Sequence, residues 1–427
     1  MVRAFGRSRY PHALEFGSGA GVGSAVLNPT CRYDPYVATA DIRLPSGALV
    51  LVREGGSVKE SYVREAAFLD YCFRGCGEPP DRLVVHHVNK SYQRSGDPDP
   101  DAFFTEADVT RRVQKLAAET SAELERLREE LREDPLLERY RNTLCMRPRS
   151  CPGCSHAIPE REDAHVSTLH RGGTLVQELL AEGITLITDI PSDRLLHRRQ
   201  EIQRETLLRG SPHVDAPALQ RFLERLVPPV SYLDFEAVCT AIPPFDGVRP
   251  WEHVPYLYSV HRETADGGVR HSHYVMEPGR DEREQMLHRL LDDLGDQGSV
   301  VVYSAGFERG VLRRLGSMIP AAAVRIGALI DRIVDLLVPF SDFAVYHHGQ
   351  AGKVSLKRVL PALTRRDYSD LNVQDGYAAN LAYRYLRERP VSAETRDTLL
   401  ADLVRYCALD TMAMVHIVRE LRELSAS

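Results

Sequence analysis

The strongest constraint on the fold is the stretch VSYLDFEAV at residues 230–238, which has the composition of a buried strand but carries two acids. Successive side chains of a strand point to opposite faces, so Asp234 and Glu236 share one face. Two carboxylates at this spacing repel each other unless a positive group lies between them, and a divalent metal ion is the usual compensating group. The pair is therefore a candidate metal site, and the alternative is a strand with one solvated face.

The length and composition limit the possible classes of protein. A chain of 427 residues is too long for one ordinary core, so we expect two or more domains. A formal net charge of -6 argues against a protein that coats nucleic acid by charge alone, so any nucleic-acid site must be a local groove. Neither a signal peptide nor an apolar run of about 20 residues is apparent, so we expect a cytoplasmic protein whose eight cysteines are reduced thiols or metal ligands.

The order of the predicted elements indicates an α/β protein with helices on both faces of a sheet. The N-terminal half contains a hairpin around the turn at Pro45, a helix, a strand and a long amphipathic helix, predicted at 36–52, 60–73, 81–92 and from 108 onward. The C-terminal half contains strands predicted at 230–238, 255–262, 269–276 and 299–304, and helices at 281–294, 306–316, 374–388 and 393–423. We divide the chain into a weakly ordered arm (1–27), an N-terminal domain (28–160), a helical linker region (161–228) and a C-terminal domain (229–427).

Two further acids lie where they can join Asp234 and Glu236. Glu308 begins a helix directly after a strand, at the edge where open α/β sheets place their ligands, although an acid also complements a helix N-terminus. Tyr406 and Asp410 are four residues apart on one face of the last helix, and the apolar neighbours of Asp410 suggest that it needs a partner.

The order Asp234-x-Glu236, Glu308, Tyr406-x-x-x-Asp410 resembles the three motifs of the DEDD exonucleases, the DnaQ-like group of the ribonuclease H-like fold. The tyrosine places the chain in the tyrosine subclass, since the histidine subclass would have His at Arg405. Family members usually have Asp at the position of Glu308. The resemblance implies a ribonuclease H-like mixed sheet and a metal-dependent 3′–5′ exonuclease of single-stranded DNA or RNA; the alternative is a non-catalytic nucleic-acid-binding or regulatory module.

The resemblance also implies a role for each site residue. Two Mg²⁺ or Mn²⁺ ions would assist cleavage of a phosphodiester, with Asp234 bridging both, Glu236 and Asp410 holding one each, and Glu308 completing the shell. Tyr406 would orient the attacking water or help to take its proton.

Residues 36 to 420 also resemble an uncharacterised bacterial family in which a DEDD-like half follows a RecB-like half. Around the site, Trp251 and Tyr256 are candidates for stacking on terminal bases, with core packing as the alternative. Candidates for phosphate contacts, or else members of a solvated helix face, are Lys353, Lys357 and Arg358.

The N-terminal half resembles the PD-(D/E)xK nucleases, which use an Asp, then Glu-x-Lys on the next strand, then a helical Gln. Asp41 matches the first position, but Leu51 and Arg53 stand where Glu and Lys should be, and Leu69 where Gln should be. Without the second acid and the lysine, this half cannot hold a metal or activate water. We interpret it as a degenerate restriction-endonuclease-like scaffold.

In the same family, a cysteine trio after the long helix can hold an iron–sulfur cluster. Cys145, Cys151 and Cys154 have the compact spacing of a cluster or a zinc site, with packing as the alternative. Cys31, His156 or another cysteine is a candidate fourth ligand. Four more cysteines are interpreted as packing residues: Cys72, Cys76, Cys239 and Cys407.

Overall fold

The computed structural model describes residues 1–15, 24–133, 164–264 and 266–426. The chain divides into two compact units: the first comprises Met1–Ile158 and Cys239–Glu252, and the second Pro159–Val238 and His253–Ser427. Both units combine sheets with helices, which confirms the predicted α/β class. Within the described ranges, no helix is long and apolar enough to cross a lipid bilayer.

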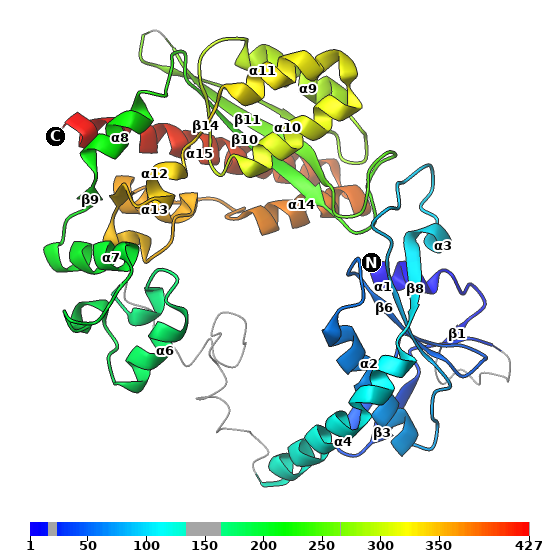
Figure 1. Ribbon diagram of the computed structural model, residues 1–427. Coiled ribbons are helices and arrows are strands. Elements are labelled where there is room, and N and C mark those ends of the chain that lie inside the picture. Colours follow the sequence, from blue (N-terminus) through cyan, green and yellow to red (C-terminus); the bar gives the residue numbers. More distant parts are fainter. Residues whose placement is uncertain (16–23, 134–163, 265, 427) are drawn as a thin grey trace. The chain divides into compact units, whose positions relative to one another are not determined.

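The first unit is built on a six-stranded sheet with the order β1-β2-β5-β6-β7-β8, and β3 and β4 pair separately, as far as the described residues go (Figure 1). Its elements are α1 (Val2–Arg7), β1 (Leu14–Glu15), β2 (Val26–Leu27), β3 (Thr30–Tyr33), β4 (Tyr36–Thr39), β5 (Ile42–Arg43), β6 (Leu49–Arg53), α2 (Glu60–Gly75), β7 (Leu83–Val88), α3 (Pro100–Phe103), β8 (Phe104–Asp108) and α4 (Thr110–Glu133).

Strand β6 is one of the two central strands of this sheet, and it pairs in parallel with β7, to which α2 connects it. Strand β6 is buried along its whole length, which explains why its sequence is a continuous apolar run and does not alternate. Leu49 and Leu51 share a core with α2 and α4, whereas Val50 and Val52 pack in a second core with Phe103.

Two predictions for this unit need correction. The hairpin exists, but only β5 and β6 form it; the strand predicted from Tyr36 is interrupted, because β4 pairs with β3. The arm predicted at 1–27 contains α1, β1 and the paired strand β2, and Val2 is buried. These elements span only two to six residues each, too few to show a hydrophobic period.

The second unit contains a five-stranded sheet with the order β12-β11-β10-β13-β14 in its described part. Its strands are β9 (His213–Val214), β10 (Ser231–Cys239), β11 (His253–Glu263), β12 (Val269–Val275), β13 (Val300–Val302), β14 (Ile333–Asp335) and β15 (Val345–Tyr346). Its helices are η1 (Val166–Thr168), α6 (Gly173–Ala181), η2 (Ile187–Asp189), α7 (Arg198–Arg209), α8 (Ala216–Leu223), α9 (Arg283–Leu294), α10 (Gly306–Met318), η3 (Pro320–Ala322), α11 (Ala323–Asp331), α12 (Val338–Ser341), η4 (His348–Gln350), α13 (Leu356–Thr364), α14 (Gly376–Glu388) and α15 (Ala393–Ala426).

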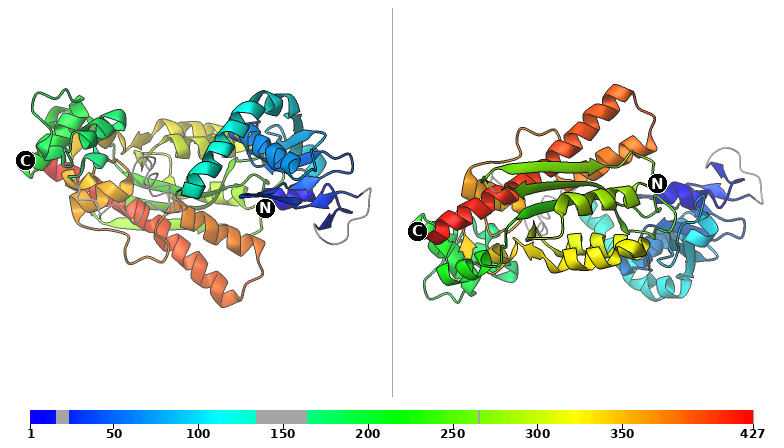
Figure 2. Two further views of the ribbon diagram at one scale, coloured as in Figure 1. Left: turned by 90° about the horizontal axis from the view of Figure 1, so that it is seen from below. Right: turned by 90° about the horizontal axis from the view of Figure 1, so that it is seen from above.

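Helices cover both faces of this sheet. Figure 2 shows α9, α10 and α11 on one face and the long helix α15 across the other. Strands β10, β13 and β14 are parallel, and β11 and β12 form an antiparallel pair, so the sheet is mixed. The described part of the segment predicted as a helical linker belongs to this unit, where β9 pairs with β15. Strand β10 lies in the middle of the sheet and carries Asp234 and Glu236 toward α15.

Candidate metal centre

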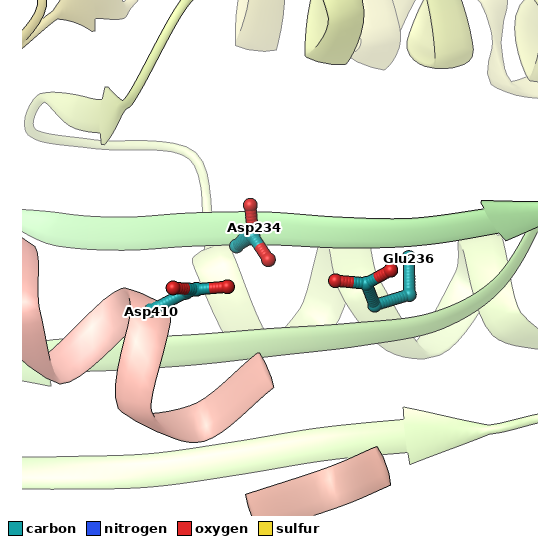
Figure 3. A group of neighbouring side chains, drawn as sticks. All are labelled: Asp234, Glu236 and Asp410. Carbon is teal, nitrogen blue, oxygen red and sulfur yellow. The ribbon is translucent and has the colours of Figure 1, made fainter. Parts of the chain in front are cut away.

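Strand β10 presents its two acids on one face, as its alternation predicts. Leu233 and Phe235 are buried on the opposite face, Asp234 is half-buried, and Glu236 is 9% exposed. Figure 3 shows both carboxyl groups beside the carboxyl group of Asp410, which comes from α15. One oxygen from each of the three residues lies within 4.8 Å of the others. We call Asp234, Glu236 and Asp410 the acid cluster.

The acid cluster is electrostatically unfavourable when it is fully ionised and has no ion between its members. Burial, followed by the charges of Asp410, Glu236 and Glu308, raises the pKa of Asp234 well above its ordinary value. Burial and then Asp410 raise the pKa of Glu236 to about 8, although Lys357 opposes the shift. Carboxylates held this close stay ionised at neutral pH only if a cation joins them.

Two tyrosines contact Asp410. The Tyr368 hydroxyl donates to Asp410 Oδ1 at 2.5 Å, and a hydrogen bond from Tyr406 also favours the ionised form, so both lower the Asp410 pKa against the rise caused by burial. Tyr406 was predicted; Tyr368 was not. It lies 42 residues before Asp410, in the turn region between α13 and α14, and no spacing rule links the two positions.

Lys357 is the cation next to the acid cluster. Its ammonium donates to the Tyr406 hydroxyl at 2.9 Å and to the Gln374 carbonyl at 2.6 Å. It also lies 4.6 Å from the Tyr406 ring centroid and 5.1 Å from that of Tyr368. The sequence predicted a phosphate contact for this lysine, and the structure places it at the tyrosine side of the site.

Cys407 is part of the site and not only a packing residue. Its thiol is fully buried and donates to Asp234 Oδ2 at 3.3 Å. Burial and the charge of Asp234 raise the Cys407 pKa, so the thiol remains a neutral donor.

The charge of Glu308 contributes to the raised pKa of Asp234, but Glu308 is not one of the three acids that meet within 4.8 Å. It is 2% exposed, and its Oε2 is buried with no hydrogen-bond partner among the described residues. Burial raises its pKa to about 8, and Asp335 adds to the shift. Asp335, which the sequence did not single out, accepts from the backbone N–H groups of Ser304 and Ala305 at 2.9 Å and so holds the start of α10.

The proposed base-stacking role is wrong for Tyr256. Its side chain is 1% exposed, and its ring stacks on Tyr383 with centroids 3.8 Å apart, so no base can reach it. Trp251 belongs to the other compact unit, where it packs half-buried against the core that contains Val2. Core packing, the alternative for both residues, is therefore what the structure shows.

The other two predicted phosphate contacts lie near Lys357 in the chain. Arg358 is exposed on α13, and Lys353 is half-buried just after η4. Of the three, Lys357 is the one whose charge acts on Glu236 and Asp410.

The donor set fits a hard divalent cation. All candidate ligand atoms are carboxylate oxygens, which Mg²⁺ and Mn²⁺ prefer over softer metals. The unpartnered Glu308 Oε2 is a second, independent indication, because a buried carboxylate oxygen without a donor is costly unless a ligand satisfies it.

The first unit also buries a carboxylate, and there an arginine neutralises it. Asp41 is 4% exposed and accepts from Arg53 Nη1 at 2.7 Å and from the Val52 amide at 2.9 Å, while Arg53 also binds Glu65. Leu51 and Leu69, at the positions of the missing Glu and Gln, are buried in the core. Arg53 thus neutralises the buried Asp41 carboxylate by a direct ion pair, and the degenerate restriction-endonuclease-like site stays a prediction.

The cysteine trio of Cys145, Cys151 and Cys154 lies outside the described residues, as does His156. The structure does bring Cys31 close to Cys76 and Cys72, and burial and the Cys76 side chain raise the Cys31 pKa to about 12. A protonated, buried thiol of this kind is typical of a packing residue. Cys239 donates to the Trp251 carbonyl at 3.2 Å.

Comparison with known proteins identifies one relationship. A family model described as a domain of unknown function (DUF2779) matches residues 231–355, which include Asp234, Glu236 and Glu308 and end before Lys357. Comparison with curated proteins found no match. Comparison with solved structures found none either.

The buried pair in the first unit gives a prediction for stability. Replacing Arg53 with Met leaves the buried Asp41 with the Val52 amide as donor and with the more distant cations Arg3 and Arg7, 3.6 and 3.7 Å from Oδ1. We therefore expect a loss of about 3 kcal/mol in urea unfolding, at the low end for a broken buried pair. The exposed pair Arg82–Asp108 provides the control, since Arg82→Met should cost about 0–1 kcal/mol. Equal losses in the two variants would contradict the importance of the buried pair.

The raised pKa values of Glu236 and Glu308 predict how stability depends on pH. Both shift from an ordinary 4.5 to about 8 in the folded protein, so the folded form keeps protons that the unfolded form releases. The contribution of these two groups to the free energy of unfolding of the metal-free protein is therefore fully present below about pH 4.5 and is lost as the pH rises toward 8, by about 1.4 kcal/mol per pKa unit for each group at most.

The measurement is urea unfolding in EDTA at several pH values. Glu308→Gln should reduce the slope and be more stable than the parent near pH 8. Saturating Mn²⁺ should also reduce the slope, because the ion stabilises the ionised carboxylates. A parent that is equally stable across this range, with or without Mn²⁺, would show that the acids are not coupled in this way.

Proposed function

We propose that the second unit is a metal-dependent nuclease, a 3′–5′ exonuclease of the DEDD type that hydrolyses phosphodiester bonds in single-stranded DNA or RNA. The observation that carries the proposal is the meeting of Asp234, Glu236 and Asp410 within 4.8 Å from two elements far apart in the sequence. The central strand, the mixed sheet and the position of Glu308 after β13 support a ribonuclease H-like architecture.

The acid cluster, with Glu308 beside it, would hold Mg²⁺ or Mn²⁺. Bound ions of this kind supply an activated water and stabilise the negative charge that develops at a phosphodiester. The chain's own contribution is to fix the ligands: β10 sets Asp234 and Glu236, α15 sets Asp410, and Asp335 fixes the helix that carries Glu308.

The two tyrosines would have different roles. Tyr406 keeps its hydroxyl at the site and accepts from Lys357, so it is placed to orient water next to Asp410. Tyr368 donates to Asp410 Oδ1 and orients this ligand. The positive charge of Lys357 acts on Glu236 and Asp410, since it opposes the rise that burial causes in the pKa of both, and this charge would attract the phosphate.

The proposal also includes a partner and a location. We propose that the protein binds nucleic acid and acts in the cytoplasm. The neutralised Asp41–Arg53 pair favours a non-catalytic role in nucleic-acid binding for the first unit.

The activity is tested with Asp234→Asn, which keeps the size of the side chain but removes its charge. We expect the parent, with Mn²⁺, to release single nucleotides from the 3′ end of a 5′-labelled single strand, and the variant to lose this activity. Asp292→Asn, on an exposed residue of α9, is the matched control and should cleave like the parent. A folded Asp234→Asn that still cleaves would refute the proposal.

The different roles of the tyrosines give a second test. Tyr406→Phe should lower kcat by about 10²- to 10⁴-fold and leave Mn²⁺ affinity nearly unchanged, because only water positioning is lost. Tyr368→Phe should weaken Mn²⁺ binding by about 10- to 100-fold and recover most of kcat at saturating Mn²⁺, because a support of a metal ligand is lost. Both quantities are measured by kinetics over a Mn²⁺ series and by calorimetric titration. If the two variants behave alike, this division of roles is wrong.

A further inference from the structure

Helix α14 carries a row of large apolar side chains that the fold does not bury. Tyr377 is 75% exposed, Leu381 43% and Tyr385 49%, and they follow one another at four-residue steps, so they lie along one face of the helix. The opposite face of α14 is buried in the core, where it contributes Ala379, Tyr383 and Leu386. A helix that packs on one side only would normally have polar residues on the other. We call Tyr377, Leu381 and Tyr385 the α14 stripe.

Direct contacts fix α14 next to the acid cluster. Asn380 donates to the carbonyl of Ala237, the residue after Glu236 on β10, at 3.2 Å. The Gln374 carbonyl, just before α14, accepts from Lys357, which also binds Tyr406. Tyr383 stacks on Tyr256 of β11. The α14 stripe therefore begins beside the site and leads away from it.

We infer that the α14 stripe is a stacking platform for the unpaired bases of a single strand whose end lies at the acid cluster. This rests on the proposed function and identifies the surface that would bind its single-stranded substrate. Tyrosine rings bind bases through their faces, which an unpaired strand exposes and a duplex hides.

The spacing of the α14 stripe and a charged residue beside it favour a single strand as the bound ligand. Eight residues of helix separate Tyr377 from Tyr385 by about 12 Å, and each four-residue step is about 6 Å. This is wider than the ~3.4 Å between stacked bases in a duplex, so the stripe suits an extended strand. Arg384 lies on the same side of the helix with its side chain 30% exposed. It pairs with Glu388 Oε1 at 3.4 Å through Nε, and its guanidinium has further N–H groups that can meet a phosphate. In the described structure, neither tyrosine hydroxyl has a hydrogen-bond partner that would assign it another role.

The test measures binding of a fluorescent 12-nucleotide single strand by anisotropy, with Ca²⁺ in place of Mn²⁺ to limit cleavage. Stacking contributes about 1–3 kcal/mol per base, so removing both rings in Tyr377→Ala/Tyr385→Ala should raise Kd by about 30-fold or more. Tyr377→Phe/Tyr385→Phe keeps the rings and should stay within about threefold of the parent. Leu208→Ala and Val324→Ala, at residues that are 61% and 85% exposed on other helices, are the matched controls and should change nothing.

The position of contact is tested with abasic sites. A strand without bases at several positions close to its 3′ end should bind the parent as weakly as the intact strand binds the double alanine variant. Combining the abasic strand with that variant should cause little further loss, because both changes remove the same interaction. Additive losses would place the contact elsewhere and overturn the inference.

Three further results would contradict the stacking platform. An alanine variant that binds as well as the parent, or a blunt duplex that binds as tightly as the single strand, overturns the platform. A parent dimer that the alanine variant converts to a monomer in sedimentation assigns the stripe to a second copy of the chain.

Failure of this inference differs from failure of the proposed function. Asp234-dependent cleavage with tyrosine-independent binding removes the platform and keeps the nuclease. Tyrosine-dependent binding of single strands without Mn²⁺-dependent cleavage keeps the platform and removes the nuclease.

Discussion

The mutual repulsion of Asp234, Glu236 and Asp410 is the constraint on which the second unit depends. Strand β10 is central in its sheet and cannot move its acids into solvent, and α15 is packed against the same sheet. The surrounding residues reduce the repulsion without removing it. Tyr368 and Cys407 donate to two of the carboxylates, and Lys357 adds a positive charge beside them. Three oxygens still face one another, and this residual instability is what a cation would relieve.

The first unit provides a comparison within the same chain. Asp41 is 4% exposed, close to the 6% of Asp410, but Arg53 binds it directly at 2.7 Å. Lys357 is placed differently, since its ammonium donates to the Tyr406 hydroxyl and to the Gln374 carbonyl. Asp41 is thus neutralised by its own ion pair, whereas the carboxylate oxygens of the acid cluster remain available to a cation. The difference supports a metal in the second unit and not in the first.

The sequence predicted many of the strands and helices of the second unit. Long apolar blocks and their flanking turns placed β10, β12, α9, α10 and α15 within a few residues. Spacing placed Asp234 and Glu236 on one face, and the resemblance to the DEDD motifs grouped Asp410 with them, as the structure does. Tyr256 was misassigned because β11 is buried on both faces, so its pattern does not show which side chains are accessible. Tyr368 could not be found, because its contact with Asp410 depends on how the segment between α13 and α14 folds back.

Charge explains why a phosphodiester suits the proposed site. Asp234, Glu236, Glu308 and Asp410 carry four negative charges when ionised, and Lys357 offsets one of them. With one divalent ion the site would keep an excess negative charge and repel a phosphate. With two ions it would have one excess positive charge, which matches the single negative charge of a phosphodiester. A second ion would thus attract the substrate as well as assist its cleavage, and the buried, unpartnered oxygen of Glu308 offers that ion a ligand outside the acid cluster.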